Sequence, residues 1–362
     1  MTLSHRQVVT VGQQGTLGTP ATPTMLLPVT SFSAEELFEQ VIDSGRRGPD
    51  ALDFKAVQGA ELYNISIEGN IQADPGATLG FAIGILLRNI FATGALSKSN
   101  VTAPVVYVHD FQLGTTKDYL TFEVDSQITD NNRRFEACRL TSLSVKWNSG
   151  EGALTYSAEA IGRAVDIRTD AQLFDPSGQV ATIEDPLMGY HANVGFNEAM
   201  NHETPASKRL ISAEWTLSRS SKPLYVGQAG QSYLDLYLGP LECTVSMVFD
   251  YSVDTDLALL RAGSSVAIVN HFSNVAPGST STTGVRRFAI GGDKFSLLEA
   301  PGVIDSSGEN LTLALSARGL YSEGTSPIIA HPNGQGWTSD IAADTMSGPV
   351  QVRLTSLRTS AY

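Results

Sequence analysis

Apolar and polar residues alternate strictly in several parts of this chain, and this pattern predicts β-strands with one buried face. Over residues 61–72, tyrosine and isoleucine fall on one face and polar side chains on the other. Two more alternating segments, 143–147 and 154–159, flank the glycine-containing stretch 148–152, which predicts a hairpin. These segments predict a mainly β protein.

A helical pattern follows the first of these strands. Asp74 and Pro75 are typical of a helix start, because Asp caps free N–H groups and Pro is tolerated at the first position. The helix is predicted to continue to about Phe91, and its apolar stripe consists of Leu79, Ile83, Leu86, Leu87 and Ile90. The same reasoning predicts a second helix from Asp254 to Gly263.

The order of elements in the first half of the chain returns in the second half. An Arg-Phe pair precedes each hairpin, at residues 134–135 and 287–288, and a Ser-Gly-Glu triplet precedes the last strand of each unit. The string Leu-Leu-Arg occurs at 86–88 and again at 259–261. The first unit is longer, with an extra segment near 96–120. We therefore predict two copies of one β domain.

These patterns divide the chain into five predicted segments: an N-terminal arm (1–25), a first β domain (26–170), a linker (171–206), a second β domain (207–325) and a C-terminal arm (326–362). The N-terminal arm is rich in Gly, Thr and Pro, so we expect it to lie outside the core. Residues 26–45 predict a strand followed by either a short helix or a second strand. The last alternating segment, 350–354, stands apart from the repeat. We predict that both arms make contacts between subunits rather than within the core, and that this segment is a candidate for adding to a neighbour's sheet edge.

The composition narrows the class of protein. A net charge of −13 argues against a general nucleic-acid binder, and 42% hydrophobic residues fit a globular protein. Cys138 and Cys243 fall in predicted strands and are interpreted as small buried residues rather than a disulfide. The longest apolar run, 79–87, is too short to span a bilayer, and the first 25 residues lack a signal-peptide core. We expect a soluble protein, without a membrane partner, made in a reducing compartment.

The sequence contains no arrangement of residues that predicts catalysis. His202 and Glu203 begin a zinc-protease motif, but position 206 is Ala where the second His belongs. The six histidines are scattered, and none has a partner at metal-ligand spacing. We therefore predict that the protein is not an enzyme and needs neither a cofactor nor a metal.

Several short stretches, taken in order, resemble the tail tube (major tail) proteins of long-tailed bacteriophages, the siphoviruses. They are the arm Gly15-Thr16-Leu17-Gly18-Thr19-Pro20, the following Leu27-Pro28-Val29-Thr30, the strand end Glu68-Gly69-Asn70 before a capped helix, and the hairpin end Ala160-Ile161-Gly162-Arg163. The resemblance covers most of residues 10–325 and implies a β-sandwich with a flanking α-helix. With the repeat, the implied fold is two tandem tail-tube-like β-sandwich domains plus the two arms.

The resemblance also implies a function in the virion. Family rings stack into a tube whose inner wall is a continuous β-barrel that conducts the genome into the host. A duplicated member resembles those that form homotrimeric, pseudo-hexameric rings. The implied partners are further copies of the chain and the tape measure, tail terminator and distal tail proteins, with DNA only in transit. The protein is then expected in the virion tail after synthesis in the host cytoplasm.

An acidic wall suits a conduit for DNA, because carboxylates repel phosphates. The acidic residues on predicted polar strand faces are candidates for this wall, and each has the alternative of lying on an ordinary solvated outer face. They are Glu68, Glu123, Asp125, Glu159, Asp235 and Glu242.

The competing interpretation is a phage-associated carbohydrate-binding or depolymerase β-sandwich. Such a module needs clustered surface tryptophans and paired carboxylates. Trp147, Trp215 and Trp337 are far apart in the sequence, and the first two occupy inward positions of predicted strands. The pattern therefore favours the structural protein over the carbohydrate-active one.

Overall fold

The computed structural model describes residues 7–43, 55–72, 81–93, 96–99, 107–126, 132–149, 152–177, 185–196, 210–227, 232–250, 265–275, 286–299, 312–324 and 346–356. Strands in the first half are β1 (Val8–Gln14), β2 (Met25–Leu27), β3 (Ser31–Asp43), β4 (Lys55–Asn70), β5 (Leu96–Ser99), β6 (Tyr107–Phe111), β7 (Tyr119–Asp125), β8 (Asn132–Asn148), β9 (Thr155–Gly162) and β10 (Ala164–Arg168). Strands in the second half are β11 (Asn193–Phe196), β12 (Leu210–Leu224), β13 (Asp235–Asp250), β14 (Val266–Ser273), β15 (Arg287–Glu299), β16 (Thr312–Gly319), β17 (Ser322–Gly324), β18 (Met346–Gly348) and β19 (Gln351–Ser356). The helical elements are α1 (Ile83–Phe91) and the 3-10 turns η2 (Asp170–Gln172) and η3 (Gly189–His191). The protein is thus mainly β, as predicted.

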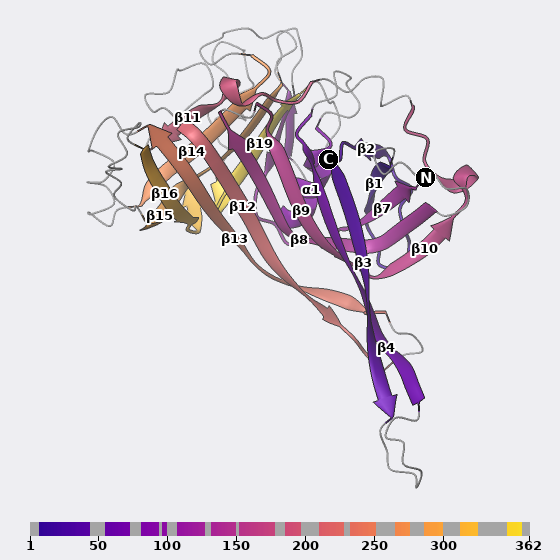
Figure 1. Cartoon of the computed structure of the whole chain (residues 1–362). Helices are drawn as coiled ribbons and strands as arrows, with labels where there is room; N and C mark the ends of the chain where they lie inside the picture. Colours follow the sequence, from indigo (N-terminus) through magenta and orange to yellow (C-terminus); the bar gives the residue numbers. More distant parts are fainter. Residues whose placement is uncertain are drawn as a thin grey trace.

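Seventeen strands are joined by hydrogen bonds into one sheet, and eight of them form an antiparallel layer that runs across the molecule (Figure 1). Its order is β3-β4-β9-β8-β12-β13-β16-β15. We call it the long sheet. The pairing of β8 with β12, over residues 142–148 and 212–218, joins the strands of the first half to those of the second. The two halves therefore share one continuous hydrogen-bonded layer.

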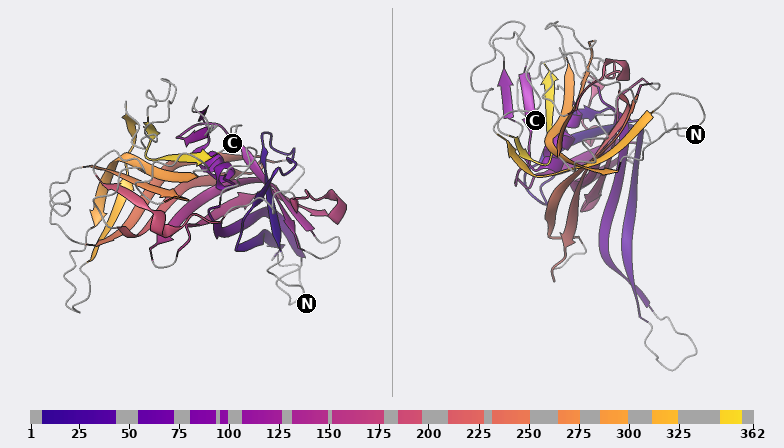
Figure 2. Two further views of the ribbon diagram at one scale, coloured as in Figure 1. Left: turned by 90° about the horizontal axis from the view of Figure 1, so that it is seen from above. Right: turned by 90° about the vertical axis from the view of Figure 1, so that its left-hand side faces the viewer.

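The second layer consists of two shorter sheets that lie behind the long sheet (Figure 2). One has the order β10-β8-β7-β1-β2, and the other has the order β11-β14-β15-β19-β6-β5. β8 and β15 belong to both layers, because each changes pairing partners partway along its length. A bulge accompanies this change in both strands, at Leu140/Ser142 in β8 and at Leu297/Glu299 in β15.

The helix α1 packs against the bend of β8 through polar as well as apolar contacts. Asn89 is 1% exposed, and its side chain donates to the carbonyl of Asp118 at 2.7 Å and accepts from the N–H of Leu140 at 2.9 Å. The amide thus satisfies a backbone N–H next to the bulge of β8. The neighbouring Arg88 pairs with the Asp118 carboxylate at 2.9 Å. The apolar residues of α1, which are Leu86, Leu87, Ile90 and Phe91, are fully buried.

The start of α1 differs from the prediction. The helix begins at Ile83, and its N-cap residue, Ala82, makes no side-chain capping hydrogen bond. Asp74 and Pro75 lie outside the described residues, as does the predicted second helix from 254 to 263. Among the described residues α1 is the single α-helix.

Both predicted arms contain core strands, so the expectation that they lie outside the core is wrong for these parts. β1 pairs with β7 over its whole length, and Val9 and Val11 are fully buried. β19 lies between β15 and β6, and all six of its residues are buried. β19 therefore pairs on both edges with strands of its own chain, and the prediction that it adds to the sheet edge of a neighbouring subunit is wrong. Both partners are distant in sequence, which local alternation does not reveal.

In the segment over residues 26–45, β2 ends at Leu27 and a second strand, β3, follows over Ser31–Asp43, so the alternative of a second strand is confirmed for the described residues. The extra segment near 96–120 contains β5, β6 and the start of β7. Its strands β5 and β6 form a hairpin, and β6 pairs with β19 from the far end of the chain. β3 and β4 together form a hairpin that projects well beyond the two layers (Figure 2).

Candidate functional site

The exposed side of the long sheet is the candidate site. Side chains that point to this side form three rows across the strands, which we call the polar face. Row one is Ser31, Glu68, Ser157, Ser144, Thr216, Thr244, Arg318 and Ser296. Row two is Ser33, Ser66, Glu159, Ser142, Ser218 and Glu242. Row three is Asn70, Thr155, Lys146, Glu214, Ser246 and Ser316.

The alternation of the strands produces this surface. Along β4, β8 and β13 the residues between the polar ones, such as Ile65, Val145 and Val245, point into the core and are at most 2% exposed. Burial of that apolar face leaves the intervening small polar residues on the opposite side of the same sheet. No residue in the three rows is buried. The strand pattern that builds the core therefore also builds the polar face.

Hydroxyl groups dominate the polar face and continue across the junction of the two halves. Ser144 on β8 and Thr216 on β12 face each other and share a hydrogen bond of 2.8 Å. Serine and threonine side chains are short, so they leave the face smooth, and they carry no charge. The face can therefore make weak, exchangeable hydrogen bonds along its whole width.

Charged residues on the polar face are few and mostly acidic. Four carboxylates occur in the three rows, from Glu68, Glu159, Glu214 and Glu242, against the two cations Lys146 and Arg318. Arg318 Nη2 contacts Glu242 Oε1 at 3.0 Å, and Lys146 lies directly opposite Glu214 in the β8–β12 pair. Each cation therefore has a carboxylate as a close neighbour.

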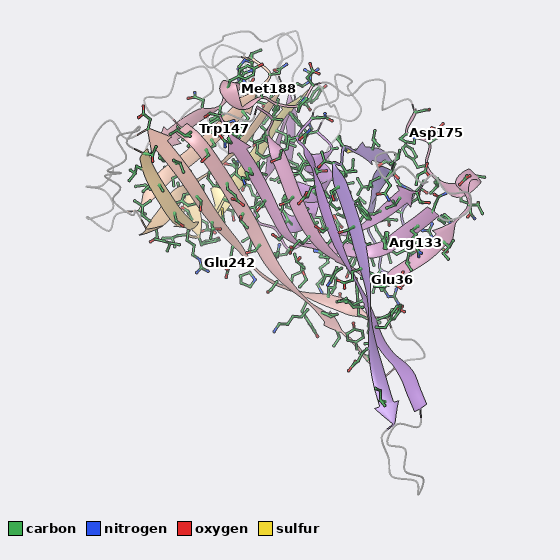
Figure 3. All side chains as sticks on the ribbon, in the orientation of Figure 1. Glu36, Arg133, Trp147, Asp175, Met188 and Glu242 are labelled. Carbon is green, nitrogen blue, oxygen red and sulfur yellow. The ribbon has the colours of Figure 1, made fainter. Side chains whose placement is uncertain are left out.

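Three of the six predicted acidic residues occupy this face. Glu68 on β4 and Glu159 on β9 are exposed diagonal neighbours. Glu242, labelled in Figure 3, is exposed on β13. Glu214 and the hydroxyl rows were not among the predicted site residues. Their signal was present, because Glu214 and Thr216 alternate with Ala213 and Trp215 in the sequence.

Of the other three predicted residues, Glu123 and Asp125 lie on β7 in the second layer, and Asp235 is the first residue of β13 in the long sheet. Glu123 on β7 is 3% exposed, accepts from the N–H of Phe174 at 3.2 Å and has Arg168 at 3.9 Å. Asp125 is half-buried on the same strand. Asp235 accepts from Lys117 at 3.0 Å and Tyr119 at 2.9 Å. The structure therefore does not place these three on the polar face of the long sheet.

The pKa of Asp235 reflects these contacts. Burial alone raises the pKa of this carboxyl, but hydrogen bonds from Lys117, the backbone N–H of Leu236 and Tyr119 outweigh it and lower the pKa below its usual range. The carboxylate is thus held ionised by groups of its own chain. Its contacts join β13 of the long sheet to β7 of the second layer.

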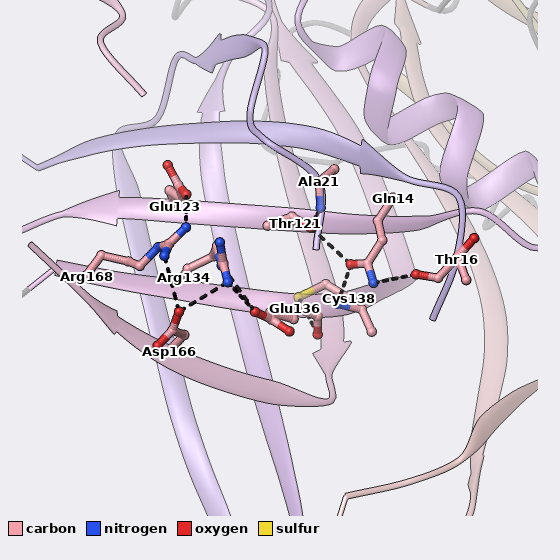
Figure 4. Close-up of polar contacts among 11 residues, drawn as sticks. Gln14, Thr16, Ala21, Thr121, Glu123, Arg134, Glu136, Cys138, Asp166 and Arg168 are labelled. Carbon is pink, nitrogen blue, oxygen red and sulfur yellow. Dashed lines mark hydrogen bonds and ion pairs between the residues drawn. The ribbon is translucent and has the colours of Figure 1, made fainter. Parts of the chain in front are cut away.

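A network of ion pairs holds β8 and β10 together in the second layer (Figure 4). Arg134 donates to Glu136 at 2.7 Å and to Asp166 at 3.1 Å. Nearby, the Gln14 amide oxygen accepts from the Thr121 hydroxyl at 3.0 Å and from a backbone N–H of β8 at 2.9 Å. These polar groups satisfy one another, so the cluster stabilises the packing of β1, β7, β8 and β10.

The described residues provide little for a ligand or a metal. An open hollow of about 460 Å³ lies on the long sheet and includes part of row two of the polar face; Ser33, Glu35, Asn64 and Glu159 are among the residues that line it. In the described part of the chain, no group of three or more His, Cys, Asp and Glu side chains is arranged to hold a metal ion. Within the same residues, no helix has the length and apolarity needed to cross a membrane.

The two described tryptophans bear on the carbohydrate-binding alternative. Trp147 is 3% exposed and packs on Phe272, and Trp215 is 1% exposed and packs edge-on against Phe295 at 5.5 Å. They serve the core and offer no stacking platform for a sugar. Trp337 lies outside the described residues. The carbohydrate-binding interpretation therefore gains no support from these side chains.

Comparison with known proteins gives one clear result. A protein-family model described as "phage tail tube protein" matches residues 4–322 of the chain, which is most of its length. A search of curated individual proteins returns no match.

Proposed function

The chain belongs to the phage tail tube protein family, and from this premise we propose that it polymerises as stacked rings into the tail tube of a siphovirus. Membership makes it a structural component of the virion tail. The proposal adds how the chain builds the tube and what the tube conducts.

The observation that carries the proposal is the pairing of β8 with β12. It turns the strands of both halves into one eight-stranded sheet with a polar face on one side and the core on the other. A wall built from such sheets presents hydroxyls and carboxylates to its channel. This surface suits a duplex that must slide without binding.

Ring closure needs free strand edges at the two ends of the long sheet. Among the described residues, β3 pairs only with β4, and the downstream end of β15 pairs only with β16. Open edges normally favour aggregation, but in a closed ring they pair with the neighbour. We propose that β3 of one chain joins the β15 end of the next, as β12 joins β8 within the chain. This contact is heterologous, and we propose that the rotation between neighbouring chains closes it into a ring rather than an open filament.

The number of chains in a ring follows from a proposed duplication. The pairing order β3-β4-β9-β8 is matched by β12-β13-β16-β15, and the bulges of β8 and β15 fall at corresponding places. If each half counts as one tail-tube domain and a ring holds six, three chains make a pseudo-six-fold ring. The Arg-Phe pairs do not correspond in this alignment. The strand pairings align Cys138, which pairs with β7, with Phe295, which pairs with β14. In this alignment the Arg-Phe pair at 134–135 lies four residues out of register with the Arg-Phe pair at 287–288.

Stacking of rings is proposed to use the projecting hairpin of β3 and β4. Leu37, Phe38 and Ile42 are 38%, 43% and 52% exposed on β3. Large apolar side chains gathered on a projecting element favour a protein partner. In a tube that partner is the next ring. The tape measure, tail terminator and distal tail proteins are the further partners of the proposed tube, and DNA passes through it only in transit.

Negative-stain microscopy of the purified chain tests the proposal. We expect rings or tubes, with three-fold or pseudo-six-fold symmetry in cross-section. Native mass spectrometry of disassembled tubes should give a mass three times 38.6 kDa. Dispersed monomers at all concentrations would contradict assembly, and six chains in a ring would contradict the duplication.

A further inference from the structure

Arg318, one of the two cations in the rows of the polar face, forms an ion pair with Glu242. Arg318 on β16 lies opposite Thr244 of β13 and Ser296 of β15. Neither hydroxyl neutralises a guanidinium. Glu242, two residues before Thr244 on β13, is a diagonal neighbour across the strands, and its carboxylate contacts Arg318 Nη2 at 3.0 Å.

This ion pair is a poor stabiliser of the fold. The side chains of Arg318 and Glu242 are 50% and 49% exposed, and pairs as exposed as this contribute little to stability. The ion pair has a larger effect on the charge that the polar face presents. An isolated guanidinium on this face is a phosphate-binding group, because its planar donors match phosphate oxygens. With Glu242 beside it, the local charge is zero.

We propose that Glu242 is a positioning residue that withholds the Arg318 guanidinium from the phosphates of DNA. The inference rests on the proposed function, since it concerns DNA passing over the polar face. One unmasked arginine in each chain recurs in every ring of a tube. DNA would then meet a repeating ladder of cations, and each phosphate contact makes binding stronger and more salt-dependent. With this ion pair, Arg318 can lie on the channel wall without binding DNA.

The test compares tubes of different variants polymerised in the presence of a short fluorescent DNA duplex, then sedimented and washed. Wild-type tubes are expected to retain almost no duplex. Glu242→Gln tubes are expected to retain on the order of tenfold more at 50 mM salt and to release it at 500 mM, because the contact is electrostatic. Glu242→Asp, which keeps the charge, and the double variant Glu242→Gln with Arg318→Gln should behave like the wild type.

The matched control is Glu35→Gln. Glu35 is exposed on β3 opposite Asn64, on the same side of the long sheet, and its loss removes one negative charge without freeing Arg318. Equal retention by Glu35→Gln and Glu242→Gln tubes would overturn the inference, since total charge alone would then explain the result. Absence of retention by Glu242→Gln tubes would overturn it as well.

The outcomes separate the inference from the proposed function. If the wild-type chain forms no tubes, the proposed function fails, whereas normal tubes with no effect of Glu242→Gln sink only the masking role. Should Glu242→Gln tubes not form, Glu242→Ser offers the same test, because serine matches the neighbouring rows of the polar face.

Discussion

Asp110 and Arg353 form a buried, two-pronged ion pair although they are far apart in the sequence. Arg353 Nε and Nη2 donate to the two carboxylate oxygens of Asp110 at 2.6 and 2.9 Å. The two side chains are 1% and 2% exposed. Asp110 lies on β6 and Arg353 on β19, directly opposite each other. The pair therefore joins the extra segment of the first half to the last strand of the chain.

Removing one partner of this pair should be strongly destabilising. Asp110→Asn leaves a buried guanidinium without its counter-charge, and we expect a loss of about 3–5 kcal/mol in the free energy of unfolding. Replacing both residues, with Asp110→Leu and Arg353→Met, should cost much less. Chemical denaturation measures both. As a control, Lys117→Gln at the half-exposed pair with Asp235 should cost no more than about 1 kcal/mol.

Deleting residues 1–25 should unfold the protein, or leave it aggregated. The deletion removes β1, which fills the space between β7 and β2, and exposes the unpaired edge of β7. A milder change, Val11→Ala, should cost about 2 kcal/mol through lost burial. Circular dichroism and thermal melting check both. A folded, monomeric deletion variant would show that β1 is dispensable.

Stability should fall as the pH rises above 10. Burial and the hydrogen bond to Asp235 raise the pKa of Tyr119 to about 12, from 10.0 in the unfolded chain. The folded state therefore keeps the phenol proton more tightly, so the stabilisation is complete below pH 10 and is lost as the pH approaches 12. Melting temperatures between pH 9 and 12 should decline less for Tyr119→Phe than for the wild type. Parallel declines would contradict the assignment to Tyr119.

The projecting hairpin should control ring stacking but not folding. Replacing both Phe38 and Ile42 with Ser removes exposed apolar surface outside the core, so melting temperature should change little while tubes shorten to single rings. Electron microscopy measures tube length. Ile167→Ser on β10 is the matched control, because Ile167 is 61% exposed but lies on the second layer. Full-length tubes from the hairpin variant would exclude this contact.

The polar side of each strand follows from local alternation and was predictable. Ile65 and Ile67 are buried while Ser66 and Glu68 are exposed, and buried residues likewise alternate with less buried ones along β9, β16 and the second half of β13. Side chains two residues apart in an extended chain point the same way whatever the partner strand is, so the sequence alone assigns them to a face. Glu68, Glu159 and Glu242 were assigned to the polar side of their strands in this way.

Alternation does not say which layer a polar face belongs to. Glu123 also precedes and follows apolar residues in an alternating strand, yet it is buried beneath Phe174 in the second layer. Asp235 likewise pairs with Lys117, from a segment more than a hundred residues away. Their surroundings are set by residues that only the folded chain brings near.

By itself the sequence determined that the protein is mainly β, where most strands run, and which side of each is polar, because these are properties of neighbouring residues. Only the tertiary structure decided the partners. Val11 and Arg353 lie in stretches that look like arms, and both become core residues because their edges meet β7 and β6. Strand pairing depends on backbone hydrogen bonds that nearly any sequence can make, so the choice among distant edges is made by the packing of the whole molecule.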